Sequence, residues 1–430
     1  MRHFTAHRSG LLFLLTGSLL GFPPLLQAQE AVSNTSASFA DTTATETKGS
    51  VPANDLGTGI FSTLPFKVSF NVRGGYDDNV TTSTAFKKGS PFTNAGVGLT
   101  YDFGDARTQL TLATGAGFTY FWDNVQVPGV NSNDYDINTY VRLAVTHKAT
   151  PRLTLSMVDY LTYQTEPDFA ISQGVNRRGG NYFFTQDKFT ANYLWAPRFA
   201  TATSYTLGAI RYDNSGIGFF SDRWENTLGN EFRFLLSPTT TLVAEYRFEI
   251  ISYDQIQRDS TTNFALAGFD HHFNTRFDVS LRGGAEFRSY DQQGGNRTSP
   301  YFEGTLNYAV GKQTTVTWTN RYAIEEPDVL LSPGRDTFRT GISARHEFTP
   351  KISASLAAYY EHDDYRSFNQ PGVFSAAFTE EDVNLSFSLR YAITRYIAVE
   401  AGYDFTDVSS DVALREYTRN RYWGGVNVTF

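Results

Sequence analysis

The chain of 430 residues has no cysteine, so no disulfide bond stabilises it and no lipid anchor attaches through a thiol. After the first 28 residues it also has no run of eighteen apolar residues, which excludes a membrane-spanning helix there. A chain of this kind can cross a membrane only as a closed sheet, which satisfies every backbone polar group and exposes one face of each strand to lipid.

Positive charge is also scarce. The chain carries 36 basic and 44 acidic side chains, and the first 28 residues contain two of the arginines and no acid, so the remainder has a net charge of −10. Nucleic acid is therefore not expected as a partner, because binding to phosphates needs a basic surface.

The first residues have the pattern of a secretory signal peptide. Arg2 and Arg8 precede the apolar run Leu11 to Leu20, and Leu26-Gln27-Ala28 fits a cleavage site. An uncleaved anchor is the alternative, but the run is short and close to that site. Residues 1–28 are predicted to be a signal peptide.

Residues 29–64 are rich in Ser, Thr and Ala and have no periodicity. They carry too little apolar surface to offset the entropy of ordering, and are predicted to be a flexible periplasmic tail. The remaining residues, 65–430, are predicted to form a barrel.

From Phe66 onward, apolar and polar residues alternate with a period of two. In residues 66–73 the odd-numbered positions are Lys, Ser, Asn and Arg, and the even-numbered positions between them are Phe or Val. Residues 242–250 and 276–288 alternate in the same way, with Glu and Arg on the polar face. Two faces of such different polarity are not both buried in a dry core, so one of them must face water.

The alternating segments predict an all-β, antiparallel, up-and-down transmembrane β-barrel of about eighteen strands, with sixteen as the next choice. Short turns with Pro or a basic residue, such as Ala149 to Arg152 and Phe348 to Lys351, alternate with longer polar loops. A soluble β-sandwich also alternates, but eighteen strands and 66 aromatic residues are too many for one. The predicted strands are 66–79, 92–103, 106–122, 134–147, 151–165, 181–195, 198–212, 222–236, 239–254, 260–272, 275–290, 298–310, 313–325, 335–348, 351–364, 379–392, 395–408 and 417–430.

The last strand places an apolar face at the carboxy-terminus. Tyr422, Gly424, Val426, Val428 and Phe430 share that face, and the chain ends on an aromatic residue. Outer-membrane proteins of bacteria with two membranes typically end this way, and their barrel assembly machinery recognises the last strand. Tyr422, Val426, Val428 and Phe430 are therefore predicted to be an assembly signal, and the protein to lie in the bacterial outer membrane with lipid and lipopolysaccharide as partners.

Residues 72–80 read Val-Arg-Gly-Gly-Tyr-Asp-Asp-Asn-Val. This segment, the repeated hairpins and the terminal Phe430 resemble the putative β-barrel porin-2 family over residues 60–430. The resemblance implies a porin-like envelope protein and names no solute. Some members are associated with exopolysaccharide export.

Aspartates follow an aromatic residue where rising strands are predicted to leave the membrane. In one interpretation the aromatic ring lies in the outer aromatic belt and the aspartate begins a turn. In the other, an acidic collar at the outer mouth binds divalent cations, bridges lipopolysaccharide phosphates or favours cations. The collar candidates are Asp77, Asp213, Asp254, Asp291 and Asp404; no other metal site is predicted.

The polar face carries both signs of charge. These side chains either pair across strands and stiffen the wall, or line a water-filled lumen that filters solutes, and both roles are compatible. The segment Glu166 to Gly180 is a candidate for an inward-folding loop, but none is long enough to be a plug, so a wide or lightly narrowed pore is expected. The pore-lining candidates are Arg73, Glu245, Arg247, Glu249, Arg276, Arg282, Glu286 and Arg288.

An enzyme is not expected. Four histidines of the mature chain, His147, His271, His272 and His346, fall at predicted periplasmic strand ends, which leaves His362 beside two aspartates as the external candidate. There is no Gly-x-Ser-x-Gly elbow, and no catalytic residue or cofactor is predicted.

The preferred function is therefore passive diffusion of small hydrophilic solutes through an outer-membrane channel. A component of exopolysaccharide export is the second choice, and a non-conducting structural or adhesive barrel is the third. The sequence is compatible with a homo-oligomer.

Overall fold

The computed structural model describes residues 66–123, 134–168, 180–291, 295–330, 332–370 and 373–430. The predicted signal peptide and tail, and most of the loop from Glu166 to Gly180, lie outside these ranges. Among the described residues, no helix has the length and apolar character to span a membrane.

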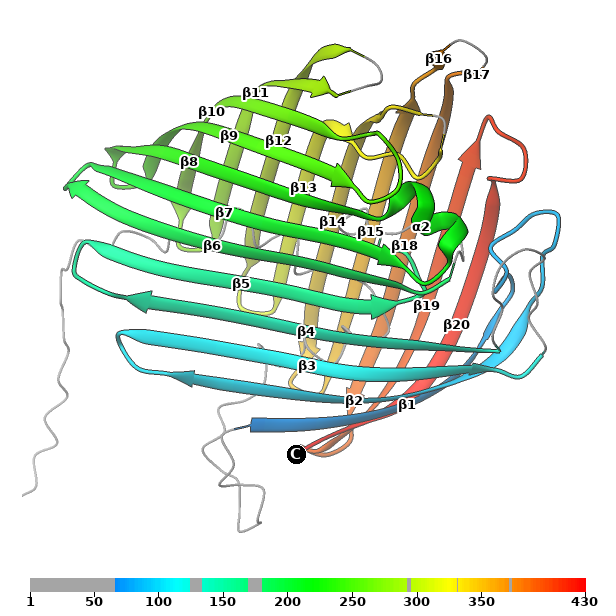
Figure 1. Cartoon of the computed structure of the whole chain (residues 1–430). Helices are drawn as coiled ribbons and strands as arrows, with labels where there is room; N and C mark the ends of the chain where they lie inside the picture. Colours follow the sequence, from blue (N-terminus) through cyan, green and yellow to red (C-terminus); the bar gives the residue numbers. More distant parts are fainter. Residues whose placement is uncertain (1–65, 124–133, 169–179, 292–294, 331, 371–372) are drawn as a thin grey trace, which may run out of the picture.

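Eighteen antiparallel strands in the described ranges form one barrel (Figure 1), which confirms the predicted fold and strand number. Each strand pairs with its neighbours in chain order. The first nine are β1 (Phe66–Asp77), β2 (Ser90–Gly104), β3 (Thr108–Phe121), β4 (Tyr135–Lys148), β5 (Leu153–Gln164), β6 (Tyr182–Ala196), β7 (Phe199–Tyr212), β8 (Arg223–Ser237) and β9 (Thr240–Tyr253). The others are β10 (Ser260–Asn274), β11 (Phe277–Tyr290), β12 (Asn296–Val310), β13 (Thr314–Glu325), β14 (Arg335–Thr349), β15 (Ile352–Tyr365), β18 (Phe378–Ala392), β19 (Ile397–Ser410) and β20 (Tyr417–Thr429).

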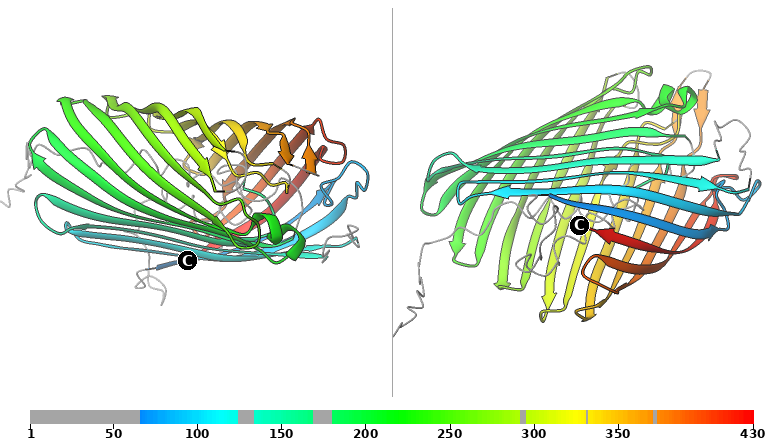
Figure 2. Two further views of the ribbon diagram at one scale, coloured as in Figure 1. Left: turned by 45° about the horizontal axis from the view of Figure 1, so that its top comes forward. Right: turned by 90° about the horizontal axis from the view of Figure 1, so that it is seen from below.

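The first and last strands close the barrel. β1 and β20 are paired from Ser69 opposite Thr429 to Asp77 opposite Arg421. The backbone N–H of Phe430 donates to the carbonyl of Val68 over 2.8 Å, and Figure 2 shows the carboxy-terminus beside the start of β1. Closure leaves no unpaired sheet edge, which is the condition for a sheet in lipid.

The two rims of the barrel differ. One, the short-turn rim, carries connections such as the two residues between β6 and β7; the other, the long-loop rim, carries longer segments. Two elements at the long-loop rim were not predicted, the helix α2 (Ser215–Ser221) and the hairpin of β16 (Phe368–Gln370) and β17 (Val373–Ser375). The Asn214 side chain begins α2 by accepting the N–H of Gly216, as an N-cap does.

The two faces of the wall follow the predicted alternation. Phe70 and Val72 of β1 are 48% and 57% exposed on the outside, whereas Arg73 is 2% exposed on the inside. The outward residues are apolar along the strands, and exposed aromatic rings such as Trp195 and Trp122 lie towards the two rims. This is the surface that a lipid bilayer requires of a barrel.

The interior has an aromatic part and a charged part. On β3 to β7 the buried inward residues form a cluster against which Ile217 of α2 packs; its members are Ala113, Tyr140, Tyr160, Tyr182, Phe184, Ile210 and Tyr212. On β8 to β15 many inward side chains are arginine, aspartate or glutamate, beside a second apolar cluster of Phe264, Leu266, Tyr301 and Ala323. The candidate site lies in this polar interior.

Candidate functional site

The charged wall contains most of the predicted pore-lining residues. Arg247 of β9 donates to Glu245 over 2.5 Å, to Glu303 of β12 over 2.6 Å and to the hydroxyl of Tyr301 over 3.0 Å. Arg282 of β11 lies 2.9 Å from Asp270 of β10. The pair of Arg247 with Glu245 lies within β9, whereas the pairs of Arg247 with Glu303 and of Arg282 with Asp270 join different strands, as in the wall-stiffening arrangement considered for the polar face.

The other inward candidates have similar surroundings. Arg288 lies 2.5 Å from Glu326 and 3.7 Å from Glu249. Glu286 is completely buried, and one of its oxygens accepts the N–H of Ile324 over 2.6 Å. Each is therefore held by named partners in the wall or in a loop.

Arg73 extends the charged interior to the first strand. Its guanidinium lies 2.9 Å from Glu400 of β19 and 4.4 Å from the ring centre of Trp423 on β20. A cation over an indole face is favourable and more so when desolvated. The contact also fixes the inward position of Trp423.

Arg276 is the exception among the pore-lining candidates, and its prediction was wrong. It lies in the turn between β10 and β11, is exposed at the short-turn rim, and its backbone N–H donates to the Asn274 side chain. The predicted strand began too early, because the polar residue Arg276 in the turn fits the alternation of apolar and polar residues in β11, which begins at Phe277.

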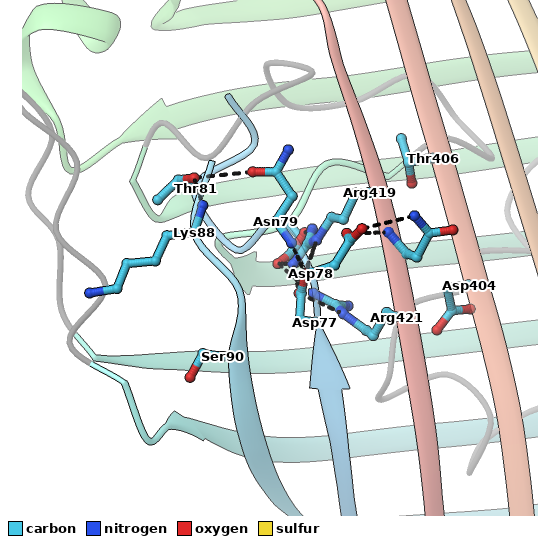
Figure 3. A network of polar contacts seen from close by, with 12 residues as sticks. Asp77, Asp78, Asn79, Thr81, Lys88, Ser90, Asp404, Thr406, Arg419 and Arg421 are labelled. Carbon is cyan, nitrogen blue, oxygen red and sulfur yellow. Dashed lines mark hydrogen bonds and ion pairs between the residues drawn. The ribbon is translucent and has the colours of Figure 1, made fainter. Parts of the chain in front are cut away.

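A four-residue ion cluster lies where the barrel closes, and Figure 3 shows three of its members, Asp77, Arg419 and Arg421. Asp77 of β1 is fully buried and accepts from Arg419 over 2.5 Å and from Arg421 over 3.1 Å, both on β20. Glu166, which follows β5, accepts from the same two arginines over 2.6 and 3.0 Å. Since four strands lie between β5 and β20, Glu166 reaches them across the interior. Glu166 begins the segment that was considered a candidate for an inward-folding loop; residues 169–179 lie outside the described ranges.

The next two residues of the Gly-Tyr-Asp-Asp-Asn segment also contact β20. Asp78 accepts from the backbone N–H of Asn420 over 2.7 Å, and the Asn79 side chain donates to the carbonyl of Thr418 over 2.9 Å. The segment therefore acts as a polar clasp, Asp77 to Asn79, between the first and last strands. Arg419 and Arg421 were not predicted; their spacing on the polar face of 417–430 was the available signal.

The five predicted collar residues fall into two groups. Asp213, Asp254 and Asp291 are exposed at the long-loop rim, where Asp254 pairs with Arg211 over 3.0 Å. Asp77 is in the clasp. Asp404 lies well inside β19 rather than at its end, and accepts from Trp423 and Ser386. The expected strand-end position of Asp404 was wrong, because β19 continues to Ser410.

A second loop segment, residues 326–330 between β13 and β14, also contacts the interior; it is called the strap below. Glu326 accepts from Arg288 and from the Tyr253 hydroxyl, each over 2.5 Å. Asp328 accepts from Arg415 over 2.9 Å. Burial raises the pKa of Glu326, but Arg288, Arg223 and Tyr253 lower it more, so it lies below its usual 4.5. The expectation of a wide or lightly narrowed pore did not include the strap.

A cavity of about 100 Å³ lies in the interior beside the clasp. Asp136 and Asn138 of β4 line one side, Asn384 of β18 and Asp404 line another, and Arg419 is in contact with it. Its lining combines these polar residues with apolar ones such as Phe92, Phe121 and Ile137.

Among the described residues, the histidines and one group of three buried carboxylates are the places that bear on catalysis and on metal binding. His362 lies 3.4 Å from Glu381 and 3.6 Å from Asp364, and no serine hydroxyl is recorded against it. His147 and His346 each contact a threonine hydroxyl near the short-turn rim, as their predicted position implied. Three carboxylates, Glu361, Asp363 and Asp382, lie within 4.8 Å of one another, but Arg335 pairs with the first two.

Comparisons with known proteins agree with this architecture. The family model described as "Putative beta-barrel porin 2" matches residues 61–430. No curated protein matches the chain.

Solved outer-membrane structures are similar to the chain at low identity. OccAB4 of Acinetobacter baumannii is 10% identical, with 88% of this chain and 100% of that chain covered and a TM-score of 0.42. The outer membrane protein OpdK of Pseudomonas aeruginosa is 11% identical, with 85% and 99% covered and a TM-score of 0.43. The siderophore receptor PirA of Pseudomonas aeruginosa is 10% identical, with 86% and 80% covered and a TM-score of 0.40. Because the family model matches the entire barrel, the chain belongs to the Putative beta-barrel porin 2 family and is a protein of the bacterial outer membrane.

Proposed function

We propose that the protein is a passive channel through which small hydrophilic solutes diffuse down their gradients. The observation that carries the proposal is the opposite polarity of the two faces of a closed barrel. Outside, residues such as Val72 are exposed and apolar, whereas Arg73, Glu286 and Arg288 on the inside are charged. Barrels of about eighteen strands leave an aqueous channel.

The passage is narrower than the strand number alone suggests. Glu166 is held across the interior by Arg419 and Arg421, and the strap enters from another side. We therefore expect solutes of the size of ions and monosaccharides to pass, and large glycans to be excluded. This favours diffusion of small solutes over exopolysaccharide export.

The exposed aspartates give the channel a preference for cations. Asp213, Asp254 and Asp291 lie at the long-loop rim, which is the extracellular side in outer-membrane barrels. A negative rim raises the local concentration of cations. Replacing all three with asparagine should shift the reversal potential towards anions, and an unchanged potential would remove this part of the proposal.

Recording from single molecules in planar lipid bilayers tests the main proposal. Purified, refolded protein should give small, steady conductance steps, and heat-dependent gel migration of the same sample should establish that the barrel is closed. A large or gated pore, with loss of surface polysaccharide when the protein is deleted, would instead favour export. Silence from a folded barrel would favour a structural or adhesive role.

A further inference from the structure

The strap, residues 326–330, joins opposite sides of the barrel. Glu326 contacts Tyr253 at the end of β9, whereas Asp328 contacts Arg415 just before β20. In the closed order, eight strands separate β9 from β20 in either direction. Glu326 and Asp328 are only two residues apart, so side chains and loops from distant parts of the barrel converge on the strap at the long-loop rim.

The contacts on the β9 side fix the backbone of the strap as well as its side chains. Arg258, which is 3% exposed, donates to the carbonyl oxygens of Val329 and Leu330 over 2.8 Å each, and to that of Pro327 over 3.3 Å. One planar guanidinium thus binds three consecutive or near-consecutive carbonyls, for which its several fixed donors are suited. The hydrogen bonds recorded for Arg258 all end on the strap.

The contacts on the β20 side form a bidentate ion pair. Arg415 donates from one nitrogen to both oxygens of Asp328, over 2.9 and 3.1 Å, and from two nitrogens to Glu380 of β18. The Tyr365 hydroxyl donates to Asp328 over 2.7 Å. Arg415 therefore binds a carboxylate of the wall, Glu380, as well as one of the strap, Asp328. Replacing Asp328 changes the strap and leaves the pair between Arg415 and Glu380 in place.

We propose that the strap restricts access to the barrel interior and sets the size limit of the channel, with Arg258 and Asp328 as the residues that position it. This inference rests on the proposed function for its channel part. The carboxylates of the strap are paired with arginines at both ends, so the strap selects solutes by their size. The exposed aspartates at the rim select solutes by their charge.

Three variants release the strap without disturbing strand pairing. Arg258→Gln removes the carbonyl contacts, Asp328→Asn weakens the ion pair with Arg415, and the double variant does both. The matched control is Arg211→Gln, since Arg211 pairs with Asp254 at the same rim and has no recorded contact with the strap. Heat-dependent gel migration should be the same for all of these, which separates strap release from loss of the barrel.

The first readout is single-channel conductance together with the largest polyethylene glycol that enters the pore. We expect the double variant to conduct at least twice as much as the unmodified protein and to admit larger polymers, while Arg211→Gln leaves the largest admitted polymer unchanged. If the unmodified protein conducts and the strap variants have the same conductance and the same size limit, the inference is wrong and the proposed function stands.

The second readout does not depend on conduction. Thr262 is fully buried and accepts from Arg288, the arginine that also holds Glu326. Because the chain has no native cysteine, Thr262→Cys can be labelled selectively from the extracellular side with a methanethiosulfonate joined to a polyethylene glycol larger than a monosaccharide. Labelling at least tenfold faster in the double variant supports the strap as a barrier even if no variant conducts, a result that would count against the proposed channel alone. Equal labelling rates with and without the strap contacts would overturn the inference.

Discussion

Replacing Asp77 with asparagine should destabilise the barrel where it closes. The Asp77 side chain is fully buried and receives donors from both Arg419 and Arg421. Removing one partner of a buried ion pair typically costs 3–5 kcal/mol. Glu166 remains beside both arginines and compensates part of the loss, so we expect the lower end of that range, about 3 kcal/mol.

Two matched substitutions calibrate this value. In Asp254→Asn the side chain lost is 37% exposed and its partner Arg211 is 26% exposed, so the cost should be below about 1 kcal/mol, as for other surface pairs. In Glu166→Gln the partly exposed loop carboxylate is lost while Asp77 stays with its arginines, so the cost should again be below that of Asp77→Asn.

The measurement is urea unfolding of the refolded barrel in lipid vesicles, followed by tryptophan fluorescence, with gel migration as a second probe. If the two probes agree and the denaturant slope is unchanged, the midpoints give the free-energy differences directly. If the losses in unfolding free energy caused by Asp77→Asn and Asp254→Asn differ by less than about 1 kcal/mol, the reasoning is refuted. Burial would then not determine how much an ion pair contributes to stability.

Three further outcomes follow from the same structure. Phe430→Ala should lower the amount of folded protein in outer-membrane fractions while leaving its mRNA unchanged; equal amounts would contradict its role as an assembly signal. Gly75→Ala should prevent closure, because a Cβ there would lie 2.1 Å from a carbonyl oxygen of the last strand, whereas at Gly283 the nearest such atom is 3.9 Å away and Gly283→Ala should give normal heat-dependent migration. The depressed pKa of Glu326 means that its contribution to stability is complete above the ordinary value of 4.5 and is lost as pH falls through the lower folded value; conductance should therefore rise as the buffer is made more acid than that value, and no rise there would contradict the ion pair with Arg288.

The sequence was sufficient to predict the wall of the barrel. A period of two assigns each side chain to one face, so the inward position of Arg73, Glu245 and Arg288 followed from the alternation. The short turns fixed the order of the strands, and Phe430 identified the end of the last one. At Arg276 the alternation continued into a turn, and at Asp404 the strand continued past the position where its end was expected.

The contacts across the interior could not be predicted in the same way. Asp328 and Arg415 belong to different loops, and periodicity within a strand contains no information about which loops fold inward. Likewise, the pairing of Asp77 with Arg419 depends on the register between the first and last strands, which closure sets. Only the segment after β5 was recognised as a candidate, because it is long and contains charged residues.

The central claim is that a closed barrel, apolar outside and hydrated inside, leaves a narrow passage for small solutes. The most direct measurement is osmotic swelling of liposomes containing the refolded protein, with neutral sugars from monosaccharides to long oligosaccharides. The account predicts fast swelling with monosaccharides and a steep fall as the sugars lengthen. Equal rates for all sugars, or no swelling above that of empty liposomes from protein shown to be folded, would contradict it.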